Sequence, residues 1–209
     1  MDYGREEITT LDDQDGTGLY WDASDLVLGI MYSMNLTDRF SFGGGVKYIG
    51  QNIYNESSSS LAIDMGLLYT SLNDNFNIGM SISNIGFDMR LSGKDLYETI
   101  DLDPENYGNN ETIISSLYTD SFPLPIFYRM GFSANSSISD NLNLLSSLDM
   151  VIPSDDVEHL NLGFELSYLD RVFIRCGYKE LGNQSSEQGI TFGFGSKVYL
   201  FGLDLNVNY

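Results

Sequence analysis

The chain has 209 residues, of which 30 are acidic and 10 are lysine or arginine, so its formal net charge is −20. This charge disfavours nucleic acid as a partner, because phosphate groups repel an acidic surface. The single cysteine, Cys176, excludes an internal disulfide framework. No apolar run reaches the roughly 20 residues that a membrane-spanning helix needs.

A two-residue alternation of apolar and polar side chains recurs in about ten segments and predicts β-strands. It is clearest at residues 40–48, where Phe40, Phe42 and Val46 share one face and Ser41 and Lys47 the other, because successive side chains of a strand point to opposite faces. In chain order, the apolar faces lie in residues 26–34, 40–48, 61–69, 76–82, 126–132, 142–150, 160–168, 172–178, 190–198 and 203–209. The apolar positions of these segments carry no charge.

The opposite faces of the same segments carry the charged side chains. These are Lys47, Asp64, Arg129, Asp149, Glu165, Arg175, Lys179, Lys197 and Asp204. A lysine or arginine on the lipid face costs roughly 2 to 4 kcal/mol at the centre of a bilayer, so a barrel places such groups in its lumen. We therefore predict that these lumen charges are structural, and that Lys47 lies near Asp64 and Arg175 near Glu165.

The connections between these segments alternate in length. Short turns are expected at residues 36–39, 72–75, 139–141, 169–171 and 200–202, and longer loops at 55–60, 91–123, 153–158 and 181–188. One rim of short turns and one of longer loops is typical of an outer-membrane barrel. Aromatic residues beside the short turns predict an interfacial girdle; they are Tyr32, Phe40, Tyr69, Phe76, Tyr168 and Phe201.

The fold class predicted is all-β, the antiparallel wall of a membrane-type β-barrel. A soluble antiparallel sandwich is the alternative, since its strands also have one apolar and one polar face. Residues 1–7 are polar and acidic and contain no secretory signal. We therefore expect residues 1–209 to form a single outer-membrane β-barrel domain that is incomplete at both ends, with the signal peptide upstream.

The long loop at residues 91–123, expected to be extracellular, is rich in carboxylates and amides. Asp101, Asp103, Glu105, Asn109 and Glu111 are candidate calcium ligands, although Gly108 falls two residues too late for an EF-hand. The alternative is a solvated acidic loop whose apolar side chains fold over the barrel mouth. No other cofactor is expected. No catalytic residue is predicted either, because no serine lies in a nucleophile motif and His159 is the single histidine.

Several motifs in succession resemble those of a known family. Ala23-Ser24-Asp25-Leu26 and residues 36–49 resemble the PorV/PorQ family of outer-membrane proteins, whose barrels are similar to those of the FadL transporters. Supporting stretches are Asn84-Ile85-Gly86, Asp101-Leu102-Asp103-Pro104, Gly108-Asn109-Asn110 and Phe122-Pro123-Leu124-Pro125. The resemblance implies a barrel of roughly 14 strands, of which this chain holds the later ten or so, in the outer membrane of a Gram-negative bacterium.

The same resemblance implies a noncatalytic protein that binds or shuttles exported proteins for type IX secretion and surface attachment. Its partners would be outer-membrane lipid and exported proteins or secretion-system components. The alternatives are a FadL-like channel for hydrophobic small molecules and, as the weakest, a surface lipid hydrolase. The sequence does not distinguish docking from transport, because we expect the plug or gate in the N-terminal segment that precedes this chain.

Overall fold

The computed structural model describes residues 1–73, 75–101, 105, 112–183, 189–200 and 203–209. These residues contain fourteen β-strands and one short 3-10 helix, η1 (Lys94–Leu96). The strands are β1 (Asp2–Glu7), β2 (Tyr20–Asn35), β3 (Phe40–Ile53), β4 (Glu56–Thr70), β5 (Phe76–Gly86), β6 (Ser92–Gly93), β7 (Tyr97–Ile100), β8 (Ile113–Ser116), β9 (Phe127–Ser139), β10 (Leu142–Pro153), β11 (His159–Tyr168), β12 (Val172–Leu181), β13 (Ile190–Leu200) and β14 (Leu203–Asn208). Across the described residues, no helix has the length and apolar character needed to span a bilayer.

Twelve of the strands form one sheet, in the order β1-β2-β3-β4-β5-β9-β10-β11-β12-β13-β14, with β6 paired to β4. Strands β7 and β8 form a separate two-stranded sheet. The ten segments predicted from the alternation correspond to β2–β5 and β9–β14, which confirms the all-β prediction. Strand β1 was not predicted, because its residues carry no apolar alternation.

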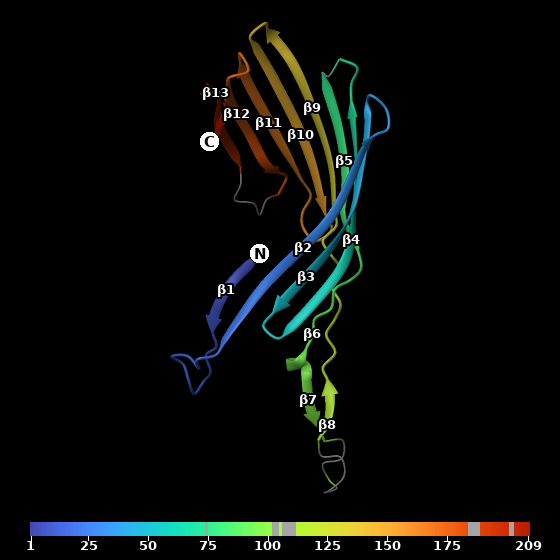
Figure 1. Cartoon of the computed structure of the whole chain (residues 1–209), viewed down its shortest axis with the longest axis vertical. Helices are drawn as coiled ribbons and strands as arrows, with labels where there is room; N and C mark the ends of the chain where they lie inside the picture. Colours follow the sequence, from blue (N-terminus) through green and yellow to red (C-terminus); the bar gives the residue numbers. More distant parts are fainter. Residues whose placement is uncertain (74, 102–104, 106–111, 184–188, 201–202) are drawn as a thin grey trace. The chain divides into compact units, whose positions relative to one another are not determined.

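The chain divides into two compact units. One comprises Met1–Ile30, Val46–Ile63 and Ile85–Leu124, and the other comprises Met31–Gly45, Asp64–Asn84 and Pro125–Tyr209. In the second unit β9, β10, β11, β12 and β13 lie side by side in chain order, each antiparallel to the next (Figure 1).

Cross-strand register keeps the two kinds of side chain on separate faces. One row across β5 and β9–β13 is wholly apolar: Ile78, Phe132, Leu148, Leu162, Tyr178 and Ile190. The adjacent row contains only small or polar residues: Asn77, Ser133, Ser147, Gly163, Gly177 and Thr191. A slip of one residue in any strand would mix the two rows, so the register follows the hydrophobic pattern.

The apolar face is exposed along the sheet. Ile30 and Phe192 are 84% and 81% exposed, and the buried hydrophobic residues of the described chain are only Ala62, Met89, Leu124 and Phe173. A sandwich would bury this face against a second sheet. Since no such sheet covers it in the described residues, the sandwich alternative is wrong, and the sheet is the wall of a membrane-type β-barrel.

The connection between β3 and β4 differs from the prediction. Instead of a loop at residues 55–60, a turn at Tyr54 and Asn55 joins the strands, with Tyr54 at φ 54°. Strand β4 begins at Glu56, and its Ser58 and Ser60 are buried. The four serines at 57–60 are polar on both faces, so the alternation carried no signal for this part of the strand.

Aromatic rings next to the short turns contact one another on the apolar face. The ring centroids of Phe40 and Tyr69 are 4.9 Å apart, and those of Tyr69 and Phe76 are 6.0 Å apart. Phe132 extends the ladder, with its centroid 6.0 Å from that of Phe76. The aromatic rings of β3, β4 and β5 thus lie together, but the girdle at a membrane interface stays a prediction, and Phe201 lies outside the described residues.

Candidate functional site

The polar face of the second unit is called here the inner face, and the strands of this unit line a hollow of about 970 Å³. Three of the predicted lumen charges, Asp64, Arg129 and Asp149, line this hollow. Its other inner-face lining residues are small or polar, apart from Met31 and Leu68: Ser33, Asn35, Ser41, Gly43, Gly45, Gly66, Gly79, Ser81, Ser83 and Gly131. Residues of the apolar face line it as well: Tyr32, Met34, Phe42, Gly44, Met65, Leu67, Met80 and Met130. The hollow therefore presents both charges of opposite sign and apolar surface.

Glycines on the inner face make room for polar side chains of the neighbouring strand. A Cβ at Gly131 would lie 2.5 Å from Oδ1 of Asp149, and one at Gly163 would lie 2.6 Å from Oγ of Ser147. A Cβ at Gly195 would lie 2.6 Å from Oδ1 of Asn208. Because a Cβ does not fit at such distances, these polar side chains lie flat against the sheet only where the neighbour is glycine.

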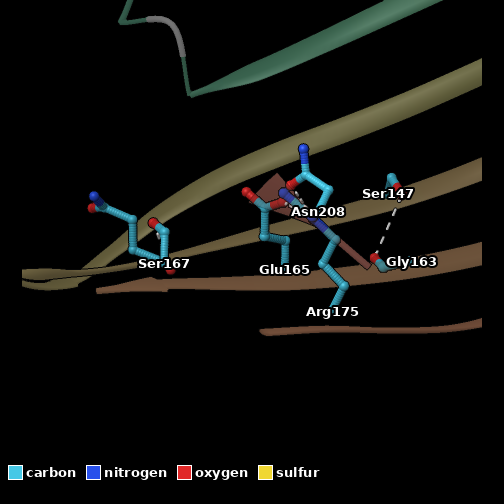
Figure 2. Close-up of polar contacts among 7 residues, drawn as sticks. Ser147, Gly163, Glu165, Ser167, Arg175 and Asn208 are labelled. Atoms are coloured by element: carbon cyan, nitrogen blue, oxygen red, sulfur yellow. Dashed lines mark hydrogen bonds and ion pairs between the residues drawn. The ribbon is translucent and has the colours of Figure 1, made fainter. Parts of the chain in front are cut away.

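A polar network joins β11, β12 and β14 on the inner face. Arg175 lies opposite Glu165 in the register, and its Nε donates to Oε2 of Glu165 at 2.5 Å. Its Nη1 also donates to Oδ1 of Asn208 at 2.9 Å. Figure 2 shows these three side chains together, beside the contact between Ser147 and Gly163. The position of the ion pair agrees with the expected pairing of Arg175 with Glu165.

Lys197 lies close to this network through Phe173, which is buried. The Lys197 ammonium nitrogen is 5.1 Å from the centre of the Phe173 ring, and the Arg175 guanidinium carbon is 5.4 Å from it. Both distances allow cation–π attraction. A buried phenylalanine between two cations was not expected from the sequence, which placed only the charges on this face.

We predict that Arg175→Met lowers the free energy of unfolding of the full-length protein by about 1 to 2 kcal/mol, between the values for exposed and buried ion pairs. The side chains of Arg175 and Glu165 are 37% and 25% exposed, so the carboxylate left behind is only partly hydrated. Urea unfolding of Arg175→Met, Glu165→Gln and the double variant measures the coupling. If the losses of unfolding free energy in the two single variants add up to the loss in the double variant, the ion pair contributes nothing to stability.

Asp64 holds the end of β5. Its Oδ1 accepts the backbone N–H of Asn84 at 2.8 Å, and Nδ2 of Asn84 donates to the Pro125 carbonyl at 2.6 Å. Asn84 has φ 66°, which few residues other than glycine and asparagine adopt readily. Sequence reasoning missed this role, because a single asparagine at the end of a strand gives no pattern.

The remaining predicted charges have the following positions. Arg129 stacks over Phe127, with 4.8 Å between its guanidinium carbon and the ring centre. Lys47 is on β3, and its Cβ faces Gly29 of β2. The side chain of Asp204 lies outside the described residues. The contact between Lys47 and Asp64, and the structural role of the lumen charges, stay predictions.

Between β5 and β9 the chain forms a two-stranded arm, defined here as residues 87–100 and 112–124. Met89 and Phe122 exchange backbone hydrogen bonds of 2.8 and 2.9 Å. Arg90 stacks on the Tyr118 ring at 4.2 Å and donates to its hydroxyl group. Leu117 N–H donates to the Leu96 carbonyl at 2.7 Å, and the β7–β8 hairpin continues this pairing. In its described residues, the expected loop at 91–123 is thus a paired structure.

The base of the arm is fixed to β4. Strand β6 pairs with Glu56 and Ser57, and Oγ of Ser60 donates to the Phe87 carbonyl at 2.6 Å. Met89 and Leu124 are buried against Ala62. The arm therefore has a small core of its own and begins from a defined position.

The calcium prediction falls largely on residues that the structure does not describe. Asp103, Asn109 and Glu111 lie outside the described residues, whereas Asp101 and Glu105 are inside them. In the described part, no three histidine, cysteine, aspartate or glutamate side chains form a group that could hold a metal ion. Calcium binding at this loop stays a prediction.

An exposed apolar face, a polar inner face with a hollow, and a paired arm together define a membrane-type β-barrel wall. No protein-family model matches the chain, and no curated protein matches it. Among solved structures, a FadL homologue from Pseudomonas aeruginosa is similar, with a TM-score of 0.47 and 12% sequence identity. The match covers 98% of this chain and 63% of the homologue, so the chain spans less than two thirds of that protein.

Proposed function

We propose that the chain forms part of a noncatalytic β-barrel protein in the outer membrane of a Gram-negative bacterium. The exposed apolar face would contact lipid, and the aromatic ladder of Phe40, Tyr69 and Phe76 would lie at the membrane interface. The charges confined to the inner face support the same arrangement.

We further propose that the protein docks exported proteins, as the resemblance to the PorV/PorQ family of the type IX secretion system implies. The exposed side chains of the arm support this proposal. Its tyrosine side chains, Tyr97 and Tyr118, are exposed although its backbone is paired, and tyrosine is enriched in protein interfaces. A surface of this kind favours binding a protein partner.

Passage of hydrophobic small molecules is the second candidate function, and the inner hollow favours it. The hollow combines Arg129 and two carboxylates with the apolar side chains of Met31 and Leu68, so it suits amphipathic solutes better than simple ions. A surface lipid hydrolase is the weakest candidate, because no serine of the chain lies in a nucleophile motif.

Deletion of residues 95–119 from the full-length protein tests the docking proposal. The bonds between Met89 and Phe122 and the pairing of β6 with β4 remain, so the barrel should stay heat-modifiable on detergent gels. Capture of exported proteins should be lost. The control variant, Asp149→Asn in the hollow, should retain capture.

The opposite result favours transport. If the deletion leaves protein export and surface attachment unchanged, and Asp149→Asn instead alters uptake of a hydrophobic solute, docking is excluded as the function of the arm.

A further inference from the structure

The β7–β8 hairpin has an open edge. Within the described residues, β8 pairs with β7 and with no other strand. Strand β7 likewise pairs only with β8 in that part of the chain, but the segment just before it is joined to β4, because β6 pairs with β4 and the Asp95 carboxylate accepts a 2.7 Å hydrogen bond from Asn55. The edge of β8 therefore belongs to the segment of the arm that makes no pairing with β4 in the described residues.

The register shows which backbone groups point outward at this edge. In an antiparallel pair, hydrogen-bonded and non-hydrogen-bonded residue pairs alternate. Leu117 donates to Leu96, so in the same register the pair of Glu98 and Ser115 is hydrogen-bonded and the pair of Tyr97 and Ser116 is not. The N–H and C=O groups of Ile114 and Ser116 therefore point away from β7. They form a template for another strand.

The hairpin exposes apolar side chains on both faces, and Ile114 is the apolar residue of β8 whose backbone groups point outward. Ile114 and Ser116 share the face of Tyr97 in the register, and Tyr97 and Ile114 are 60% and 71% exposed. Tyr118, two residues beyond the end of β8, is 75% exposed. A strand added to β8 would cover Ile114 and Tyr118 with every second side chain, so apolar residues at alternate positions would fit.

Charge limits which strand would bind. The segment from 87 to 124 contains eight carboxylates and two basic residues, and Arg90 is already stacked on Tyr118. A second copy of this acidic hairpin would be repelled, whereas a basic strand would be attracted.

We propose that the outer edge of β8 binds an extended, basic segment of the exported protein by strand addition. This inference rests on the proposed docking function and names the part of the partner that the arm would recognise. Backbone hydrogen bonds to Ile114 and Ser116 would supply affinity, while the Ile114 and Tyr118 side chains and the acidic charge would select alternating apolar and basic residues.

Proline substitution tests the edge without removing the hairpin. Ser116→Pro deletes an outward N–H that takes no part in the β7–β8 bonds, and proline is tolerated at such edge positions. The probe is a synthetic peptide of alternating lysine and valine, titrated onto the full-length protein in detergent. Ser116→Pro should raise its Kd about tenfold, which corresponds to about 1.4 kcal/mol of lost backbone pairing.

Two matched variants and one matched peptide serve as controls. Ser116→Ala keeps the N–H, and Thr99→Pro makes the same change at the edge of β7, so both should bind the peptide within about twofold of the unmodified protein. A peptide of alternating glutamate and valine should bind at least about tenfold more weakly. Equal weakening by Ser116→Pro and Thr99→Pro, no weakening by either, or equal binding of both peptides would overturn the proposal.

The outcomes separate this inference from the docking function. If deletion of residues 95–119 abolishes capture of exported proteins while Ser116→Pro binds the basic peptide normally, docking stands and strand addition is wrong. If the deletion leaves capture unchanged, docking is wrong, and strand addition to exported proteins is excluded with it.

Discussion

Replacement of Met130 by lysine should lower the free energy of unfolding of the full-length protein in lipid vesicles by about 1 to 3 kcal/mol, between the cost of a lysine near the membrane interface and the cost at the bilayer centre. Met130 lies in an exposed apolar cross-strand row with Met80 and Met150, and this row is two residues from the aromatic ladder at Phe132. An ammonium group here would face the hydrocarbon of the bilayer. Urea unfolding measures the change in free energy, with the loss of heat-modifiability on detergent gels as the readout.

Ser133→Lys is the matched control for this prediction. Ser133 lies on the same strand but in the polar row with Asn77 and Ser147, so its lysine would face the lumen. We expect a change within about 0.5 kcal/mol, as for most substitutions in a hydrated position. Equal destabilisation by both variants would refute the assignment of the two faces.

Gly86→Ala should destabilise the base of the arm by about 1 to 3 kcal/mol, the usual cost of overpacking. A Cβ at Gly86 would lie 2.4 Å from the Leu61 carbonyl oxygen, 2.8 Å from Cδ1 of Leu124 and 3.0 Å from Cβ of Ala62. The nearest atom belongs to the backbone of β4, so the chain has to move. Limited proteolysis of the full-length protein should then cleave the arm faster.

Gly79→Ala on the same strand is the control. A Cβ there would have Leu68 Cδ1 as its nearest neighbour, at 3.9 Å, which is ordinary van der Waals contact. Both the unfolding free energy and the rate of cleavage should stay close to those of the unmodified protein. Protease resistance of Gly86→Ala equal to that of Gly79→Ala would show that the close contacts do not hold the arm.

The ten long strands could be predicted because their apolar side chains repeat with the two-residue period of a half-buried sheet. Where the period is absent, prediction failed for a physical reason. Strand β1 is charged along its length and is held by pairing with β2 rather than by an apolar face. The start of β4 is a run of serines without an apolar period. Its position as a strand depends on the tight turn at Tyr54 and Asn55 and on pairing with the arm.

In the candidate site, too, some features could be predicted from the sequence and others could not. Alternation together with the short turn at 169–171 was enough to place Arg175 opposite Glu165, because the turn fixes the register of β11 against β12. The hairpin of the arm could not be predicted, since β7 and β8 have four residues each and lie beside acidic sequence without a period. The left-handed conformation of Asn84 depends on Asp64 and Pro125, which are distant in sequence.

The attachment of the arm determines how it would respond to mechanical load. Three contacts join the same short segment of the arm to β4: the pairing of β6 with β4, the Ser60–Phe87 hydrogen bond and the burial of Met89. A partner pulling along β4 would load these contacts in shear, simultaneously, whereas a sideways pull would open them one after another. The arm is thus anchored most firmly in one direction, along the strand that carries it.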